Sequence, residues 1–535
     1  MKADLVVAGG TIYTMDLARP VVEALAIAGE RIVAVGEAVT IRDYVGPATQ
    51  VVDLAGSTAI PGLTDAHVHF VAYGLSLQQV DLAGVRSPGE AVERVRARAA
   101  VTPAGEWLHG RGWDRNLWSP AEFPNRWQLD AASPVHPVVL RSKDLHALWL
   151  NSLALRKLGL DQAAQDTCGG QILRDAQTGE ATGVLLEEMA SAALQRIGKP
   201  GPQTLARAIV EAAGLAHRLG LTGVHDCEEG EELAAFLSLR REGTLPLRVY
   251  MLIPRDSLDA AIRLGLQSGL GDDWLRIGHL KVFADGSLGS HTADMLEPYD
   301  GEETNRGIGA LEGDALRQVV ERASGAGIAV ATHAIGDRAN RRVLDAYAAT
   351  RPIWARQGLR PRIEHAQLLA DSDLLRLAQL GVVASMQPVH ATSDWEMAEA
   401  YWGPRVRGAY AWRSLLEAGT VLAFGSDCPV ETLSPLAGIY AAVTRQRPDG
   451  SPAGGWQPQE RVSVYDAVRA YTWGAAYAAG EEARKGSLTP GKVADLVVLS
   501  DDIFKAPPET LLGVQVLRTI CGGRVVFLAA GVDRA

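Results

Sequence analysis

Hydrophobic and polar positions alternate between two patterns from about residue 200 to residue 486. Short runs such as GIAVATHA and TVLAFGSD are rich in small and β-branched residues and predict strands, whereas GDALRQVVERASGAG repeats its apolar positions at helical spacing. Strands that alternate with helices are typical of parallel βαβ units. Together with TAIPGLTDAHVHF, near the N-terminus, the pattern gives eight strands, the number of a closed (β/α)8 barrel. We therefore expect an α/β fold with a TIM barrel formed by residues 58–69 and 200–486.

The segment between the first and second predicted strands is about 150 residues long, too long for a loop in a compact domain. It carries signals of its own. Ser87 and Glu90 have the spacing of a helix capping box, with Pro88 at the first helical position. EWLHGRGWD and HPVVLRSKD read as strands, and QILRDAQTGEATGVLLE reads as a hairpin. We expect an inserted α/β subdomain over residues 70–199.

The two ends of the chain have the same pattern of hydrophobic and polar residues. DLVVAGGTIYTMD near the N-terminus and TICGGRVVF near the C-terminus are short alternating strands separated by glycine turns. A few strands at either end could not bury a face alone. We therefore expect residues 1–57 and 487–535 to pair into one composite β-domain.

Composition excludes several classes of function. The chain is 47% hydrophobic and 21% charged with a net charge of −11, which is typical of a globular protein, and it has no run of lysine or arginine that would suit nucleic acid. No apolar stretch is long enough for a membrane helix, and no signal peptide is visible. Four scattered cysteines without a CxxC pair argue for a reducing compartment. We expect a cytoplasmic protein that binds neither nucleic acid nor membrane.

Titratable residues gather where the predicted strands end. His67 and His69 would point to the same side of an extended strand, as a pair of metal ligands would, although a partly exposed strand end is an equally good interpretation of this pair alone. Other strand ends add His225, Asp226, Lys281, Asp285, His333, Glu364, His365 and Asp427. The carboxyl ends of barrel strands are where catalytic groups collect. Five of the 12 histidines lie at these ends, which favours a shared site.

These residues lie in motifs that resemble a known family. PGLTDAHVHF, LKVFADGSLGSHTA, ATHAIGDRAN, RIEHAQ, FGSDCPV and LTPGKVADLVVL occur in this order. They resemble the metal-dependent amidohydrolase superfamily. More narrowly, they resemble amidohydrolase family 3, in the branch with a large insert after strand 1 that includes N-substituted formamide deformylases. The resemblance runs nearly end to end and implies a distorted barrel with a composite β-sandwich.

The resemblance also implies a metal centre with one or two divalent ions. His67, His69 and Asp427 would hold one ion and His333 and His365 the other, while Lys281 would bridge them as a carbamate formed with carbon dioxide. Only a neutral amine reacts with carbon dioxide, and burial beside cations favours that form. The alternative is a charged Lys281 that pairs with Asp285 or a substrate carboxylate. Zinc is the expected metal, and manganese, iron, cobalt or nickel would suit the same ligands.

Substrate-binding residues are expected around this centre. His291 stands where relatives often carry arginine. The other candidates for the pocket wall are His225, Asp285, His146, Arg111 and Trp113. For Arg111 and Trp113, packing inside the insert is an equally good interpretation. Asp65 and Glu364 are expected to orient ligating imidazoles.

Two further residues carry an open alternative. His390 could reach the mouth of the barrel or lie solvated in a loop. Cys428 follows Asp427 but has no evident base in the sequence, which favours a buried thiol.

The leading functional hypothesis is hydrolysis of a C–N bond in a small amide, such as an N-formyl or N-acyl amine, by a metal-activated water. Asp427 would accept the proton of the water and pass it to the leaving nitrogen. A cyclic amidase or a deaminase would use the same ligands and remains an alternative. A catalytically inactive barrel that serves as a binding protein is the alternative from another class. A homodimer is compatible with the sequence.

Overall fold

A computed structural model of the chain describes residues 1–143, 147–160, 170–228, 230–289, 291–311 and 313–532. The chain divides into two compact units. Met1–Tyr73 and Ile209–Ala535 form the first unit, and Gly74–Ala208 form the second.

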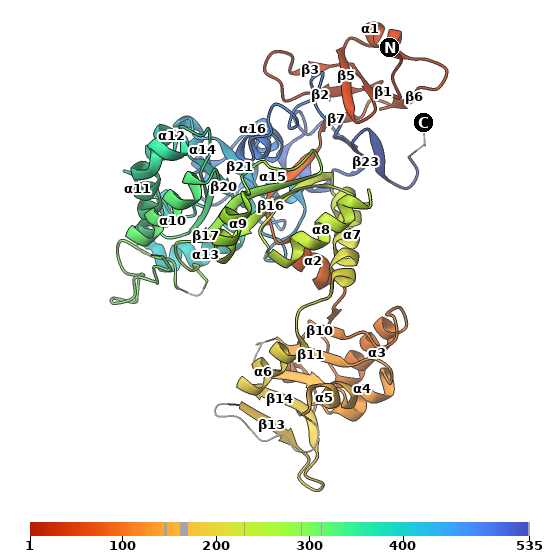
Figure 1. The fold of residues 1–535 in the computed structure, drawn as a ribbon, viewed down its shortest axis with the longest axis vertical. Helices are drawn as coiled ribbons and strands as arrows, with labels where there is room; N and C mark the ends of the chain where they lie inside the picture. The colour runs from red at the N-terminus through yellow and green to blue at the C-terminus, as the bar shows by residue number, and fades with distance from the viewer. Residues whose placement is uncertain (144–146, 161–169, 229, 290, 312, 533–535) are drawn as a thin grey trace. The chain divides into compact units, whose positions relative to one another are not determined.

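The first unit contains the expected barrel (Figure 1). Its parallel strands follow one another around a nearly closed sheet in chain order. They are β8 (Leu63–Val68), β15 (Leu221–Asp226), β16 (Arg248–Pro254), β17 (Leu275–Phe283), β18 (Val330–Ala334), β19 (Arg362–His365), β20 (Val383–Met386) and β21 (Leu422–Phe424). The fold class predicted from the sequence is therefore confirmed.

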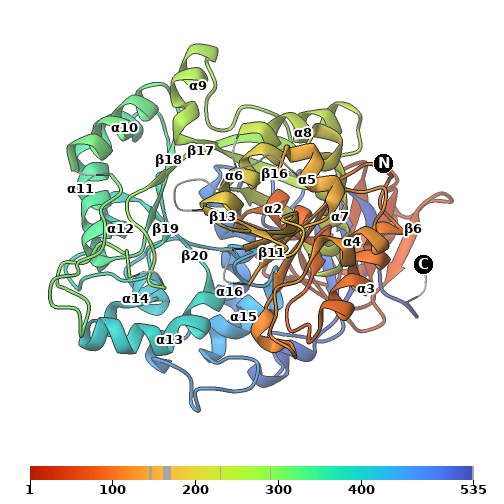
Figure 2. The same ribbon diagram turned by 90° about the horizontal axis from the view of Figure 1, so that it is seen from below.

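Helices alternate with these strands and cover the outside of the sheet. Figure 2 shows α10, α11, α12 and α14 on the outer side of β18, β19 and β20. The helices within this part are α8 (Gly230–Arg241), α9 (Leu258–Leu264), α10 (Gly313–Gly325), α11 (Asp337–Trp354), α12 (Leu374–Leu380), α13 (Pro388–Trp402), α14 (Trp412–Glu417), α15 (Pro435–Thr444), α16 (Val464–Arg469) and α17 (Ala475–Ala478). The chain crosses between the two units within α2 (Phe70–Leu77) and α7 (Pro202–Arg218). Tyr347 of α11 is fully buried and its hydroxyl lies 2.8 Å from the hydroxyl of Thr332 in β18, which fixes this helix against the sheet.

The two ends of the chain build a β-sandwich within the same unit. One sheet has the order β5-β4-β1-β6 and the other β24-β23-β22-β7-β2-β3. The strands are β1 (Leu5–Ala8), β2 (Thr11–Tyr13), β3 (Val21–Val22), β4 (Ala24–Ala28), β5 (Arg31–Gly36), β6 (Gln50–Asp53), β7 (Thr58–Pro61), β22 (Leu496–Leu499), β23 (Val516–Cys521) and β24 (Arg524–Leu528), with the short helix α1 (Ala38–Ile41). Leu25 and Ile27 of the first sheet share a core with Leu496 and Ile520 of the second, so neither end buries its face alone.

The first predicted strand is in fact two strands in different sheets. β7 pairs with β22 in the sandwich, whereas β8 pairs with β15 in the barrel. The chain passes from one to the other at Gly62, where a β-carbon would come within 2.3 Å of the Thr222 hydroxyl. Glycine is needed at this close approach. The Pro61-Gly62 pair at this point is a turn signal that the sequence analysis did not use.

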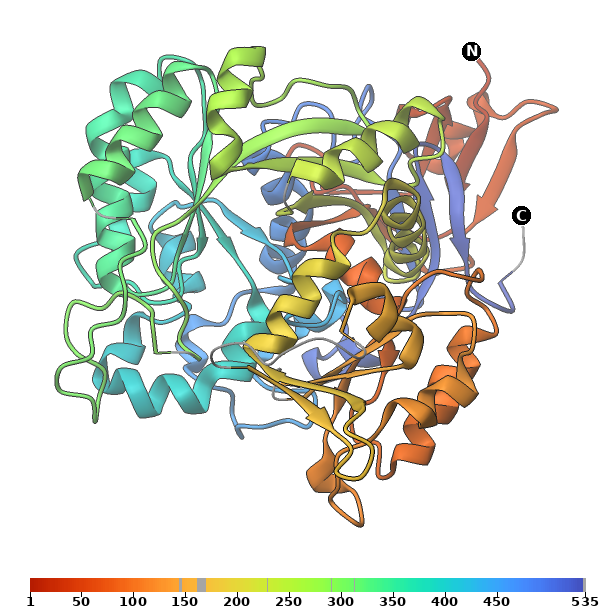
Figure 3. The ribbon, with the colours of Figure 1, turned by 60° about the horizontal axis from the view of Figure 1, so that its bottom comes forward.

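The second unit is a mixed sheet covered on both faces (Figure 3, orange to yellow). Its strand order is β13-β14-β12-β11-β10-β9, from β9 (Val80–Asp81), β10 (Leu108–Trp113), β11 (Val138–Ser142), β12 (Ala147–Leu150), β13 (Gly170–Arg174) and β14 (Ala181–Glu187). Residues of α3 (Pro88–Ala99) and α4 (Arg126–Ala132) pack with Val138 and Leu140 on one face, and α5 (Ser152–Leu158) and α6 (Glu188–Ile197) pack with Val139 on the other.

Local signals in this unit take the expected form with one change. Ser87 caps α3 by accepting a hydrogen bond from the backbone N–H of Glu90 at 3.1 Å. The Glu90 carboxylate accepts from the N–H of Arg86 at 3.0 Å, one residue before the position that a closed capping box requires. β13 and β14 form the predicted antiparallel hairpin.

Within the described residues, a search for membrane-crossing helices finds none of sufficient length and apolarity.

Candidate metal centre

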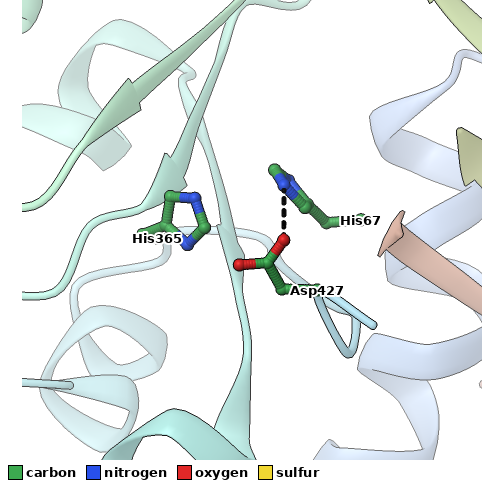
Figure 4. Close-up of side chains that lie close together, drawn as sticks. All are labelled: His67, His365 and Asp427. Atoms are coloured by element: carbon green, nitrogen blue, oxygen red, sulfur yellow. Dashed lines mark ion pairs between the residues drawn. The ribbon is translucent and has the colours of Figure 1, made fainter. Parts of the chain in front are cut away.

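The carboxyl ends of the barrel strands bring the predicted ligands together. His67 lies at the end of β8, His365 is the last residue of β19, and Asp427 follows β21. One donor atom from each lies within 4.8 Å of the other two, and Figure 4 shows His67 facing Asp427 with His365 alongside. His69, one residue beyond β8, also reaches Asp427.

The spacing of these atoms suits ligands of a shared ion. His67 Nε2 lies 3.5 Å and His69 Nε2 lies 3.4 Å from the same carboxylate oxygen of Asp427. Good N–H···O hydrogen bonds are shorter, at about 2.7–3.2 Å. Two ligands of one tetrahedral ion, with bonds of about 2.0–2.2 Å, stand about 3.4 Å apart. The donor set therefore fits a divalent metal ion.

Each of the three buried imidazoles is held through the ring nitrogen that faces away from the others. His67 Nδ1 contacts Glu364, His365 Nδ1 lies 2.8 Å from Oε1 of Gln387, and His333 Nε2 lies 2.9 Å from the carbonyl oxygen of Gly286. An oxygen acceptor requires that nitrogen to donate, which leaves the opposite nitrogen with a lone pair whenever the ring is neutral. This is the arrangement that fixes the tautomer of metal-ligating histidines.

Burial keeps two of these rings neutral. Burial, together with the charge of Lys281, lowers the pKa of His333 to about 3. Burial and the neighbouring rings of His333 and His67 hold the pKa of His365 well below its usual range. A neutral imidazole is the form that binds metal, so both rings are ready to ligate near pH 7.

Asp427 is held as a carboxylate. Burial opposes its ionisation, but contacts with His390, His67 and His69 hold its pKa well below the usual range. His390 Nε2 lies 3.2 Å from the second carboxylate oxygen. Because His390 is buried in α13, the interpretation of a solvated loop residue is wrong.

Two of the candidate ligands have unusual backbone angles. φ is +73° at His365 and +58° at Asp427. This left-handed conformation costs a residue with a side chain about 1–2 kcal/mol, so it persists only where the surrounding structure enforces it. The turns at the ends of β19 and β21 therefore direct these two side chains into the centre at some cost in stability.

A fully buried ion pair lies behind His67. Arg362 Nε lies 2.5 Å from Glu364 Oε1, and both side chains have no exposed surface. Arg362 also donates to His225 Nδ1 at 2.9 Å and to the carbonyl oxygen of Ala66 at 3.2 Å. Burial opposes the ionisation of Glu364, but Arg362 and His67 hold its pKa well below the usual range. Glu364 is thus a fixed anion behind a candidate ligand, as expected from the sequence.

Asp65 acts differently from the expectation. Its Oδ1 accepts the backbone N–H of His67 at 3.0 Å and that of Ser426 at 3.0 Å. It therefore ties β8 to the turn that precedes Asp427 and orients no imidazole. The reason is that its short side chain meets backbone amides before it can reach a ring.

Lys281 lies next to the candidate ligands. Its Nζ is 3.5 Å from His67 Nε2, and the residue is 5% exposed. Asp285, the alternative partner of Lys281, instead accepts the backbone N–H groups of Asp294, Ile335 and Gly336. Its Oδ1 is also 3.5 Å from His333 Nε2. Asp285 thus joins two loops at the mouth of the barrel.

The remaining substrate candidates are scattered. His291 lies in the loop after β17, where its Nδ1 is 2.6 Å from Glu302 Oε1 and its ring packs on Tyr401. His225 is fully buried against Arg362, so it presents no surface.

The candidates from the insert have separate surroundings. Trp113 is 1% exposed in the core of that unit and donates to the carbonyl oxygen of Leu140, as the packing alternative predicts. Arg111 is exposed on β10, and His146 lies outside the described residues.

Other neighbours of the centre escaped the sequence analysis. Arg362 precedes Glu364 by two positions, and that same-face spacing is a signal that could have identified it. Gln387 follows β20 directly, as a residue at a strand end. Cys428 is 2% exposed, and burial raises its pKa to about 12, which agrees with a buried thiol.

Comparison with known proteins identifies the family. A model described as the amidohydrolase family matches residues 50–527. The protein LONG AFTER FAR-RED 3 of Arabidopsis thaliana is 34% identical over 98% of this chain and 92% of its own length. The N-substituted formamide deformylase of Arthrobacter pascens is 29% identical over 99% of both chains.

A solved structure gives the same result. The crystal structure of an uncharacterized metal-dependent hydrolase from Pyrococcus horikoshii OT3 matches with a TM-score of 0.77 at 29% identity, and the match covers 94% of this chain and 99% of that one. With these matches, the barrel and the donor set, the chain belongs to the amidohydrolase family, in the large-insert branch of amidohydrolase family 3.

Proposed function

We propose that the chain hydrolyses a C–N bond in a small linear amide, such as an N-formyl or N-acyl amine. The observation that carries this proposal is the set of three buried imidazoles whose outer nitrogens are held by Glu364, Gln387 and Gly286. Orientation of this kind fixes the tautomer of histidines that ligate metal ions.

The donor set divides into two groups. His67, His69 and Asp427 would hold one ion, and His333 and His365 would hold a second. Lys281 would bridge the two as a carbamate, which its burial and its 3.5 Å distance from His67 support. Nitrogen and carboxylate donors without a thiolate suit zinc, which we propose as the metal.

Metal ions in such a site lower the pKa of a coordinated water and polarise the substrate carbonyl. Asp427 then accepts the proton of the attacking water and delivers it to the leaving nitrogen. The contact between His390 and Asp427 keeps that carboxylate oriented and ionised for the first transfer.

The choice of a linear amide is supported by one relative. The deformylase of Arthrobacter pascens acts, by its name, on N-substituted formamides, and it matches this chain along its whole length. A formyl group is the smallest acyl group, so formamides are the first substrates to test.

The proposal is tested by a hydrolysis screen of the purified full-length chain, with zinc or manganese added, over N-formyl, N-acyl and cyclic amides. We expect turnover of at least one linear amide, with release of the free acid and the amine. Turnover of cyclic amides alone, or release of ammonia from a ring, would replace the proposal with a cyclic amidase or a deaminase. No turnover by a chain that binds no metal would indicate an inactive barrel.

A further inference from the structure

One aromatic side chain lies directly over the candidate centre. Phe283 is the last residue of β17 and follows Lys281 by two positions, so both point to the same side of the strand. The Nζ of Lys281 is 4.9 Å from the centre of the Phe283 ring, and the rings of Phe283 and His333 are 5.1 Å apart at 41°. The ring therefore contacts two of the residues proposed to form the metal centre.

Phe283 is unusually accessible for its type. It is 50% exposed, whereas Lys281 below it is 5% exposed. The chain has seven phenylalanines, all within the described residues, and Phe283 alone among them is exposed. Full burial of a phenylalanine side chain is worth about 1.5–3 kcal/mol, so part of this gain is forgone here.

The position of the Phe283 ring suggests a role for its exposed surface. Single exposed apolar residues are normal on protein surfaces. This one stands at the carboxyl end of a barrel strand, where substrates of such barrels bind, and it touches the candidate centre itself. A substrate whose carbonyl reached that centre would have to pass or contact the ring.

A second exposed apolar residue follows the strand opposite β17 in the barrel. Val430 is 66% exposed and belongs to the turn after β21, in which its N–H donates to the carbonyl oxygen of Asp427 at 2.9 Å. β17 and β21 are the fourth and the eighth strands from β8, so they lie on opposite sides of the barrel. Exposed apolar residues are thus associated with strands on two opposite sides of the barrel.

We infer that Phe283 selects substrates with an apolar substituent next to the reacting amide. This inference rests on the proposed function and adds a substrate class to it: amides with an alkyl or aryl group, as opposed to a hydroxylated or charged one. The half-exposed ring would bury its free face against that group on binding. Phe283 then acts as a specificity residue and takes no part in proton transfer.

The test compares matched probes on the metal-loaded full-length chain. The first series is N-butylformamide with its terminal-hydroxyl and terminal-ammonium analogues, and the second places the same three groups on the acyl side of an N-methyl amide. We expect the wild type to prefer the butyl group in at least one series by about tenfold in kcat/KM. Partial burial of a few apolar carbons against the ring gives a preference of that size. The two series show on which side of the amide the ring acts.

Substitutions of Phe283 test whether its ring causes that preference. Phe283→Ala is expected to remove most of the tenfold preference, mainly through a higher KM for the butyl probe, and Phe283→Leu to keep part of it. Rates are divided by bound metal, and the Leu variant serves if the Ala variant does not fold. Leu375→Ala, at a 58% exposed position on α12, is the matched control and should keep the wild-type preference.

Two results would overturn the inference in distinguishable ways. Wild-type hydrolysis without an apolar preference, or a preference that survives in Phe283→Ala, would remove the role of the ring and leave the proposed function standing. A metal-loaded wild type that hydrolyses neither series would remove the linear-amide function and this inference together.

Discussion

Two buried arginine–carboxylate pairs in this barrel have the same chemistry and different surroundings. Arg362 and Glu364 lie behind His67, whereas Arg248 of β16 makes two bonds, at 2.6 and 2.9 Å, to Asp495 just before β22 of the sandwich. All four side chains are at most 7% exposed. The first pair reaches a candidate metal ligand and the second joins the barrel to the β-sandwich.

Burial and charge therefore do not by themselves identify a functional group. Both pairs bear the desolvation cost of buried ions and recover it through close geometry. What separates them is the next contact: Glu364 touches the His67 ring, while Asp495 accepts the backbone N–H of Gly522 at 2.8 Å. Function is therefore expected to follow the first pair, and assembly of the fold the second.

The largest expected effect separates two aspartates. Asp427→Asn removes the proposed proton acceptor, so turnover per bound metal should fall about 1,000-fold while most of the metal stays bound. Asp495→Asn should leave turnover per bound metal at the wild-type value. Steady-state kinetics with metal analysis makes the comparison, and substantial activity in Asp427→Asn would refute its role.

Removal of either arginine should cost similar stability but affect the metal differently. Arg362→Met and Arg248→Met each leave a buried carboxylate unpaired, which lowers the free energy of unfolding by about 3–5 kcal/mol. Denaturant unfolding of the metal-free chains measures this cost. Only Arg362→Met should also bind metal more weakly. Equal metal affinity in the two variants would abolish the distinction between the pairs.

A smaller change tests the contact to His67 alone. Glu364→Gln keeps the size of the side chain and removes its charge, so metal affinity should fall about 10–100-fold. Competition with a chelator measures the affinity, and Asp495→Asn is the matched control. If both variants bind metal like the wild type, Glu364 has no orienting role.

The smallest effect concerns pH and two histidines, one near each pair. Burial and the charge of Arg362 lower the pKa of His279 to about 3. Burial also lowers the pKa of His217, and the charge of Asp495 offsets part of that shift. An unfolded histidine has a pKa of about 6.5, so between these values only the unfolded chain takes up the proton. Stability is therefore lost as pH falls from about 6.5 toward 3, by at most about 1.4 kcal/mol per pH unit for His279.

His279→Gln should flatten this slope, and His217→Gln should flatten it less. Denaturant unfolding between neutral and mildly acidic pH measures both. A larger effect of His217→Gln would show that burial beside Arg362 does not lower the pKa of His279 more than the pKa of His217 is lowered.

The sequence predicts the barrel well because alternation of strands and helices is a local signal. The order of strands and the ends that carry His67, His333 and His365 follow from that alternation. The break at Gly62 does not follow from it, although the Pro61-Gly62 pair is a local turn signal at that point.

Side-chain contacts were harder to predict than positions. The sequence analysis placed Glu364 beside a ligating imidazole, but it did not show that Arg362 fixes Glu364 or that Asp65 binds backbone amides. Trp113 was misleading because an indole in a strand looks the same whether it lines a pocket or a core. Such distinctions depend on which atoms meet in the folded chain, and the residue pattern alone does not specify them.

Metal analysis of the purified chain shows directly whether the imidazoles from separate strands and Asp427 together bind divalent metal ions. We predict one or two divalent ions per chain in the wild type, and loss of bound metal in His365→Gln, which removes the imidazole. A wild-type chain that holds no divalent metal, and gains none when zinc or manganese is supplied, would contradict the account.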